Sequence, residues 1–173
     1  MSTIKNVQTI KTKTGTTAMT IDAAGVVKQP TKPMFRVVRS ADQSIANDTA
    51  TVVQLDDKTT TGFFDIGGYF NTSTYRYTPL VTGYYSVTAS GLLESAHYMW
   101  TSIRRNGTEE FSSRDAATSG AVFPTSIASG ILYMNGSTDY LDVTVYHNAG
   151  SSKNIRGLDS MRGATYFCGF LIG

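Results

Sequence analysis

The sequence predicts an all-β domain built as an antiparallel sandwich, and three observations support this prediction. The 173-residue chain contains 10 tyrosines, 8 phenylalanines and 16 glycines, which suit half-buried strands and the turns between them. Short strand-like segments recur at spacings of roughly 8–12 residues, as in a sandwich or barrel. Helical periodicity is missing from every segment longer than about ten residues. The length fits one domain with a short extra segment.

Residues 1–32 form that extra segment, which is polar and rich in lysine and threonine. Within it, residues 16–21 and 26–28 can pair across a turn at 22–25. Its few apolar side chains cannot bury a core, because small two-stranded units are marginally stable in water. We therefore expect residues 1–32 to be an extended anchoring arm, held by sister chains or a larger assembly. Packing against its own domain, residues 33–173, is the alternative.

The expected strands of the domain follow in order. They are residues 34–39, 51–55, 62–66, 74–78, a strand that starts at Gly83, and then 97–105, 127–134, 140–146 and 164–172. Alternation places Tyr75 and Tyr77 on one face, and Tyr85, Val87 and Ala89 on another. Asn106-Gly107 is the strongest hairpin signal in the chain, while the small and polar residues 112–129 are interpreted as a long loop.

The last strand predicts self-association. Residues 166–172 are apolar on both faces, which is typical of a strand covered on both sides. One side of a sheet in a lone sandwich normally faces water, so the second cover would come from neighbouring copies. The low share of charged residues, 16%, points the same way.

Four motifs in order resemble the complement globular-head family, whose trimeric jelly roll is shared with tumour necrosis factor. The first runs through residues 69–87, with Asn71, Tyr77, Pro79, Gly83, Tyr85 and Val87 at the family's positions. The others are the strand and Asn-Gly turn at 103–107, a late hairpin at 132–143, and the closing strand at 164–172. The resemblance implies a homotrimeric jelly roll over residues 33–173.

The chain departs from the family pattern at two places. The turn at residues 135–139 is wider than the family's, which puts a family-type ion site there in doubt. The Gly-X-Y stalk that often precedes the domain is also missing. In its place, residues 1–27 resemble the opening of many bacteriophage fibre proteins, which implies contacts with other virion proteins through residues 1–32.

Charge and targeting features argue against nucleic-acid binding, membrane spanning and signal-directed secretion. The net charge is +2 and basic residues are scattered, so nucleic acid is not an expected partner. Arg104 and Arg105 are the densest basic spot, and as strand neighbours they are expected to point to opposite, solvated faces. No stretch approaches the roughly 18 apolar residues of a membrane span. The start of the chain lacks the pattern of a secretory signal.

The sequence offers little to an enzyme. His97 and His147 are interpreted as surface or interface residues rather than metal ligands. Cys168 is interpreted as a buried structural thiol rather than a nucleophile activated by His147. The doublets Asp56-Asp57 and Glu109-Glu110 diverge along their strands and form no obvious acid/base pair. We therefore predict no catalytic residue, cofactor or metal.

Two further groups of residues have competing interpretations. Asn47, Asn71, Asn106 and Asn135 have glycosylation spacing, but asparagine is also a natural turn residue, and the turn role is preferred. Trp100, with Tyr98 and His97 beside it, is assigned to the core or an interface. Contact with a receptor is the less favoured alternative.

The sequence therefore predicts a non-enzymatic structural virion protein of a bacteriophage. It would be a trimeric fibre or knob that attaches to the host surface, a glycan or a protein, or that decorates the particle, and it would be assembled in the host cytoplasm. The alternative is a soluble receptor- or glycan-binding trimer.

Overall fold

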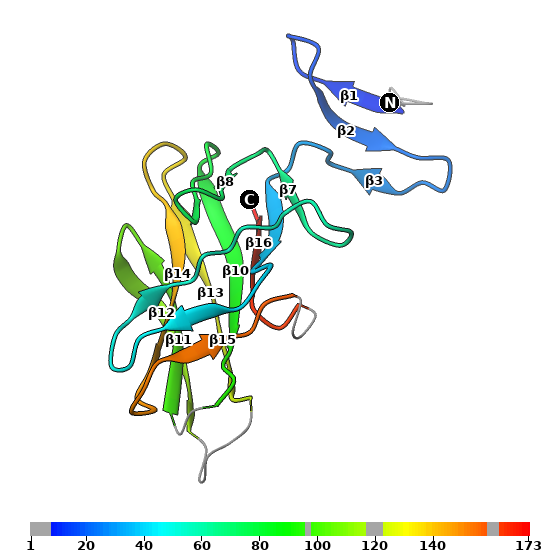
Figure 1. Cartoon of the computed structure of the whole chain (residues 1–173). Coiled ribbons are helices and arrows are strands. Elements are labelled where there is room, and N and C mark those ends of the chain that lie inside the picture. The colour runs from blue at the N-terminus through cyan, green and yellow to red at the C-terminus, as the bar shows by residue number, and fades with distance from the viewer. Residues whose placement is uncertain (1–7, 96–97, 117–122, 159–162) are drawn as a thin grey trace. The chain divides into compact units, whose positions relative to one another are not determined.

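The computed structural model describes residues 8–95, 98–116, 123–158 and 163–173 (Figure 1). The chain divides into two compact units, Met1–Lys32 and Pro33–Gly173. All strand pairings of the described residues are antiparallel. Each unit is described separately below.

The first unit is a three-stranded sheet, β1 (Thr9–Lys11), β2 (Thr17–Ile21) and β3 (Val27–Lys28). The expected pairing across the turn at 22–25 is confirmed, with Ile21 opposite Val27. Asp22 closes this turn, because its Oδ1 accepts the backbone N–H groups of Ala24 and Val26. Strand β1, which pairs with β2, was not predicted.

The second unit is built from two main sheets. The five-stranded sheet has the order β13-β10-β16-β4-β7, and the six-stranded sheet has the order β12-β11-β14-β9-β8, with β6 also paired to β14. A short separate pair joins β5 to β15. The strands are β4 (Met34–Val38), β5 (Gln43–Ile45), β6 (Thr51–Val52), β7 (Phe64–Ile66), β8 (Phe70–Asn71), β9 (Arg76–Tyr77), β10 (Gly83–Leu92), β11 (Tyr98–Arg105), β12 (Thr108–Ala116), β13 (Thr125–Met134), β14 (Leu141–His147), β15 (Lys153–Ile155) and β16 (Tyr166–Leu171).

The chain crosses repeatedly between the two main sheets. It passes from β10 to the hairpin β11–β12 in the other sheet, returns for β13, crosses again for β14 and returns for β16. This connectivity makes the unit the antiparallel jelly-roll sandwich that the sequence predicts. In Figure 1, β16 lies beside β10, in the middle of the five-stranded sheet.

The core fills the space between the sheets. Tyr85, Val87 and Ala89 of β10 are at most 1% exposed and share the inner face, as predicted. Aromatic rings pack at the centre, with Phe35 and Tyr77 stacked at 3.9 Å and Phe35 edge-on to Phe167 at 4.8 Å. Burial raises the pKa of the Tyr77 hydroxyl far above its usual value, which keeps this group neutral.

Two predictions about turns and faces have different outcomes. The Asn106-Gly107 hairpin is confirmed between β11 and β12, and both residues have positive φ, 53° and 84°. The shared face of Tyr75 and Tyr77 is wrong, because Tyr75 has a φ of 61° and lies in a turn before β9. The side-chain oxygen of Asn71 holds this turn by accepting the N–H groups of Ser73 and Thr74.

Two other expectations are corrected. Residues 112–129 are not one long loop, because β12 runs to Ala116 and β13 begins at Thr125. Strand β12 is polar because it forms the edge of its sheet. The late hairpin at 132–143 is not a paired hairpin: β13 pairs with β10 while β14 pairs with β11, in the other sheet.

Candidate functional site

The outward face of the five-stranded sheet carries exposed apolar side chains. Ile131 of β13 is 61% exposed, Tyr84 of β10 is 56% exposed and Phe170 of β16 is 49% exposed. They point outward because their strand neighbours fill the core, and successive side chains alternate between the faces of a strand. We call this surface the apolar sheet face.

The strand register arranges the apolar sheet face in rows. In the first row, Tyr84 lies opposite Tyr133 with ring centroids 5.6 Å apart. The second row consists of Ile131, Ser86, Phe170, Met34 and Ile66, and the third consists of Ser129, Thr88, Cys168, Arg36 and Phe64. Large apolar side chains thus dominate the first two rows, whereas the third row is mostly polar.

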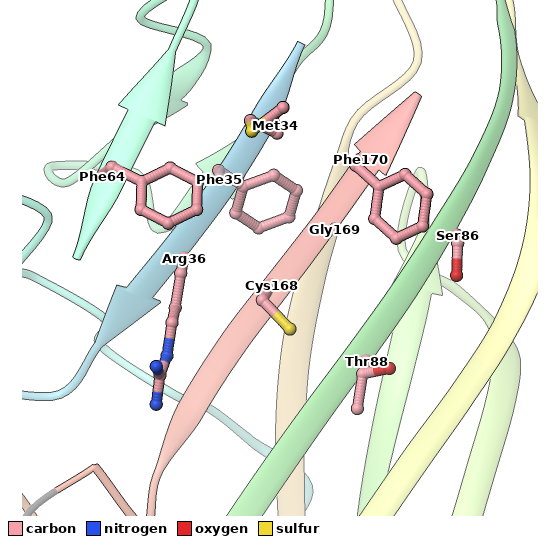
Figure 2. Close-up of a pocket in the computed structure, with 9 residues that line it drawn as sticks. All are labelled: Met34, Phe35, Arg36, Phe64, Ser86, Thr88, Cys168, Gly169 and Phe170. Atoms are coloured by element: carbon pink, nitrogen blue, oxygen red, sulfur yellow. The ribbon is translucent and has the colours of Figure 1, made fainter. Parts of the chain in front are cut away.

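A pocket of about 360 Å³ opens on this face (Figure 2). Gly169 lies between Cys168 and Phe170, and its Cα points toward the core, where an added Cβ would come within 3.0 Å of the Phe35 ring. The pocket is lined by Met34, Phe35, Arg36, Phe64, Ser86, Thr88, Cys168, Gly169 and Phe170. Its lining is mainly apolar, with hydroxyl groups on one side.

Arg36 is the charged side chain of this lining. Its guanidinium lies over two aromatic rings, 5.4 Å from the centroid of Phe63 and 5.6 Å from that of Tyr166. Burial raises the pKa of the Cys168 thiol, and the positive charge of Arg36 opposes that shift without cancelling it. The thiol is therefore neutral near pH 7 and is not activated as a nucleophile.

The structure places Cys168 and His147, the less favoured alternative of a nucleophile and its base, in different sheets. His147 lies in β14 of the other sheet and is 0% exposed, so its assignment to the surface or an interface is wrong. Its Nε2 pairs with the carbonyl oxygen of Ile45, and its Nδ1 accepts the N–H of Ala149. Cys168 faces outward from β16 and is half-buried rather than buried. His97 lies outside the described residues.

The acidic and basic doublets have structural partners. Asp56 pairs with Arg39 and Ser40, while Asp57 accepts the N–H groups of Thr59 and Thr60 in a turn. Glu109 accepts a hydrogen bond from Ser102, and Glu110 pairs with Arg105. Arg104 is bound to Asp142, so the solvated role expected for the two arginines is wrong.

Trp100 belongs to neither the core nor the apolar sheet face. It lies half-buried on the outward face of the six-stranded sheet, because its neighbours Met99 and Thr101 are the residues that point inward. Tyr98 and Tyr146 lie beside it, with ring centroids 5.4 Å and 5.1 Å from the indole. The sequence showed Tyr98 near Trp100, but only the register of β11 and β14 brings Tyr146 to them.

No group of three or more His, Cys, Asp and Glu side chains within the described ranges could hold a metal ion. The same residues contain no helix with the length and apolarity needed to cross a membrane.

The fold defines the class of this domain: it has the jelly roll of the complement globular head and of tumour necrosis factor. It is similar to the globular domain of zebrafish complement 1qA protein, with a TM-score of 0.60, 19% identity, and coverage of 82% of this chain and 98% of that one. It is also similar to Eiger TNF from S. frugiperda, with a TM-score of 0.57, 10% identity, and coverage of 82% and 91%. For murine APRIL the TM-score is 0.56, the identity 12%, and the coverage 81% and 98%.

No family model and no curated protein matches the sequence. The suspected complement-like and tumour-necrosis-factor-like fold is therefore confirmed by structure alone.

Proposed function

We propose that this chain is a non-enzymatic binding module that works as a homotrimer, with its subunits packed through the apolar sheet face. The observation that carries this proposal is the group of large exposed apolar side chains on that face, which includes Ile131, Tyr84 and Phe170. Contiguous apolar surface on a soluble protein marks a site of association. Covering these side chains in an assembly removes them from water and stabilises it.

The number three comes from the family resemblance of the sequence. A closed ring is the symmetric solution when one patch on a subunit packs against a different patch on the next. A trimer also repeats each weak recognition surface three times, so that avidity exceeds the affinity of a single site.

A measurement of mass in solution tests the trimer. We expect light scattering after size exclusion to give three times the single-chain mass of 18.7 kDa at micromolar concentration. Ile131→Glu places a charge on the apolar sheet face, and since Ile131 is 61% exposed, this change leaves the fold of one chain intact. It should give single chains.

Ser112→Glu is the matched control, because it adds the same charge at an exposed position of β12 in the other sheet. This variant should remain trimeric. A wild-type chain that stays single at micromolar concentration, or an Ile131→Glu variant that stays trimeric, would contradict the proposal.

We further infer that the module serves as a bacteriophage fibre or knob, assembled in the host cytoplasm and attached to the virion through residues 1–32. Two features support this placement. The first is the resemblance of residues 1–27 to the opening of phage fibre proteins. The second is the small separate sheet, which exposes Ile10, Ile21, Val26 and Val27 and so leaves apolar surface for a partner to cover.

Purified particles test the virion role. Antibodies raised against residues 33–173 should label phage particles in electron micrographs at a fibre or on the capsid. If the protein is absent from particles and present as a free trimer, the soluble receptor- or glycan-binding module replaces the virion role.

A further inference from the structure

A cluster of aromatic rings lies on the outward face of the six-stranded sheet. Tyr98 and Trp100 come from β11 and Tyr146 from β14, and all three are half-buried. The Tyr98 ring is edge-on to the indole, while the Tyr146 ring is tilted by 35° to it. Aromatic side chains present a large rigid surface at low entropic cost, which suits recognition.

Charged groups of opposite sign flank these rings. The guanidinium of Arg114, an exposed residue of β12, lies 4.1 Å from the centre of the Trp100 ring. The hydroxyl of Tyr146 donates a hydrogen bond to Asp48 at 2.9 Å. The cluster therefore offers a charged donor at one edge and a charged acceptor at the other. We call Tyr98, Trp100, Tyr146, Arg114 and Asp48 the aromatic surface.

One polar group of the aromatic surface is unsatisfied. The indole N–H of Trp100 is shielded from solvent and has no hydrogen-bond partner among the described residues. Buried donors without a partner are rare in folded proteins and call for an explanation. A ligand oxygen that reaches this N–H would supply the missing acceptor.

The position of the aromatic surface suits recognition by a tethered domain. Strand β10 begins beside the C-terminal residue, since the N–H of Tyr84 bonds the carbonyl of Gly173, and Leu171 bonds Pro33 at the same end. β10 then runs ten residues, roughly 30 Å, to the other end, where β11 starts with Tyr98. The aromatic surface thus lies far from Pro33, where residues 1–32 join the domain.

The aromatic surface also lies on a different sheet from the apolar sheet face. A trimer packed through the five-stranded sheet would leave this part of the six-stranded sheet open. Each trimer would then present three copies of it.

We propose that the aromatic surface binds carbohydrate, an inference that rests on the proposed role of the chain as a binding module. The C–H face of a sugar ring is apolar and packs on an aromatic ring, while each sugar hydroxyl both donates and accepts hydrogen bonds. Arg114 supplies donors, Asp48 supplies an acceptor, and the three rings supply the stacking surface. A purely anionic or purely cationic ligand would meet one like charge here.

Cross-strand packing alone accounts for the contacts between these rings, since such pairs stabilise sheets. The register also places Arg114 directly opposite Trp100, so cross-strand pairing accounts for the guanidinium over the ring. It does not account for the unsatisfied indole N–H. A second stack of the same kind exists on this sheet, where Arg76 lies 3.8 Å from the centre of the Tyr140 ring. No further ring contact of Tyr140 is found among the described residues, so this pair serves as a matched control.

The single tryptophan of the chain provides the readout. Because Trp100 is the only indole, a change in tryptophan fluorescence reports on this surface. We would titrate the full chain with glucose, galactose, N-acetylglucosamine and N-acetylneuraminic acid, and screen it on an array of bacterial and animal glycans. We expect at least one saccharide to change the emission in a saturable manner.

Variants locate the binding site by calorimetry with that saccharide. Arg114→Ala and Trp100→Ala should each weaken binding about tenfold or more, as truncations at binding hot spots do. Asp48→Asn keeps a residue that tolerates the φ of 52° at this position and should weaken binding through loss of the charged acceptor. Arg76→Ala should bind as the wild type does. Arg114 is exposed, so its variant keeps the test valid if Trp100→Ala fails to fold.

Three outcomes would overturn the proposal: no saccharide of the panel or array binds, Arg114→Ala binds with unchanged affinity, or the surface captures a purified protein while no glycan binds. The mass of the same samples separates this inference from the proposed trimer. A trimer that binds no glycan overturns the carbohydrate site alone, whereas a single chain that binds one through Trp100 overturns the trimer alone.

Discussion

The carboxylate of Asp142 is 3% exposed in β14, and Arg104 binds it through two hydrogen bonds of 2.7 and 2.9 Å. Charge-assisted bidentate pairs of this kind are strong, and they also raise the pKa of Arg104. A single substitution that removes the arginine leaves a buried charge without a partner. We therefore expect Arg104→Met to lower the free energy of unfolding by about 3 kcal/mol.

Urea unfolding followed by circular dichroism checks this value. The double variant Arg104→Met, Asp142→Leu removes both charges and should regain most of the lost stability, because apolar replacement of a whole pair is often neutral. If the single variant is as stable as the wild type, water rather than Arg104 satisfies Asp142.

Cys168 allows a test of pH dependence at the residue scale. Burial raises the pKa of its thiol above its ordinary value, and only the thiolate reacts with iodoacetamide. At pH 8 the folded chain should therefore react more slowly than the chain in urea, and the rate should keep rising above pH 9. Mass spectrometry of quenched samples measures the rate. The Cys168 thiol of the Ile131→Glu variant should be alkylated faster than that of the wild type, because assembly through the apolar sheet face would cover Cys168 in the wild type. Equal alkylation rates in the two proteins would show that assembly does not cover Cys168.

At the scale of elements, the hairpin between β11 and β12 depends on backbone conformation. Gly107 has a φ of 84°, and an added Cβ would meet only the Tyr140 hydroxyl, at 3.8 Å. The substitution Gly107→Ala therefore destabilises the chain through the unfavourable φ of this residue and not through a steric clash. We expect a loss of about 1–2 kcal/mol in the free energy of unfolding. The next residue, Thr108, is exposed, and Thr108→Ala should change stability little. Equal effects of the two substitutions in urea unfolding would show that the turn does not limit stability.

The strands that the sequence predicted correctly carry local signals. Alternation in β10 and the Asn-Gly pair after β11 depend on neighbouring residues, so they can be recognised without the fold. The apolar sequence of the closing strand β16 also predicted a central position in its sheet, because a strand at the edge of a sheet is not expected to be apolar on both faces.

The features that the sequence missed depend on distant partners. Strand β12 is polar and was interpreted as a loop, because only its pairing with β11 makes it a strand. Tyr75 was misplaced because nothing in its alternation reveals the turn that Asn71 holds. His147 is buried because Ile45, about a hundred residues earlier in the chain, accepts its hydrogen bond, and no spacing rule relates the two.

Of the two candidate sites, the apolar sheet face has a local sequence signal, whereas the aromatic surface depends on residues distant in the chain. The apolarity of residues 166–172 predicted a second face that neighbouring copies cover, and within one chain the structure leaves Phe170 on that face 49% exposed. The aromatic surface joins residues from β11, β12, β14 and the loop at Asp48, so only the register of the sheet could reveal it.

At the scale of the whole molecule, the two outward faces of the sandwich differ in chemistry. One is apolar and suits permanent cover by copies of the same chain. The other combines half-buried rings with charged groups and suits a ligand that remains partly in water. This division would let assembly and recognition be changed independently by substitutions on separate sheets.

Residues 1–32 provide the last prediction. The unit Pro33–Gly173 contains both main sheets and the whole buried core, so its stability should not depend on the preceding segment. We expect the chain without residues 1–32 to keep the trimeric mass and to melt within a few degrees of the full chain. The isolated segment 1–32 should lack a cooperative transition, because Ile10, Ile21, Val26 and Val27 are exposed and a sheet of this size has no core. Calorimetry and light scattering measure both. Loss of the trimer on truncation would show that the segment, rather than the apolar sheet face, holds the three copies together.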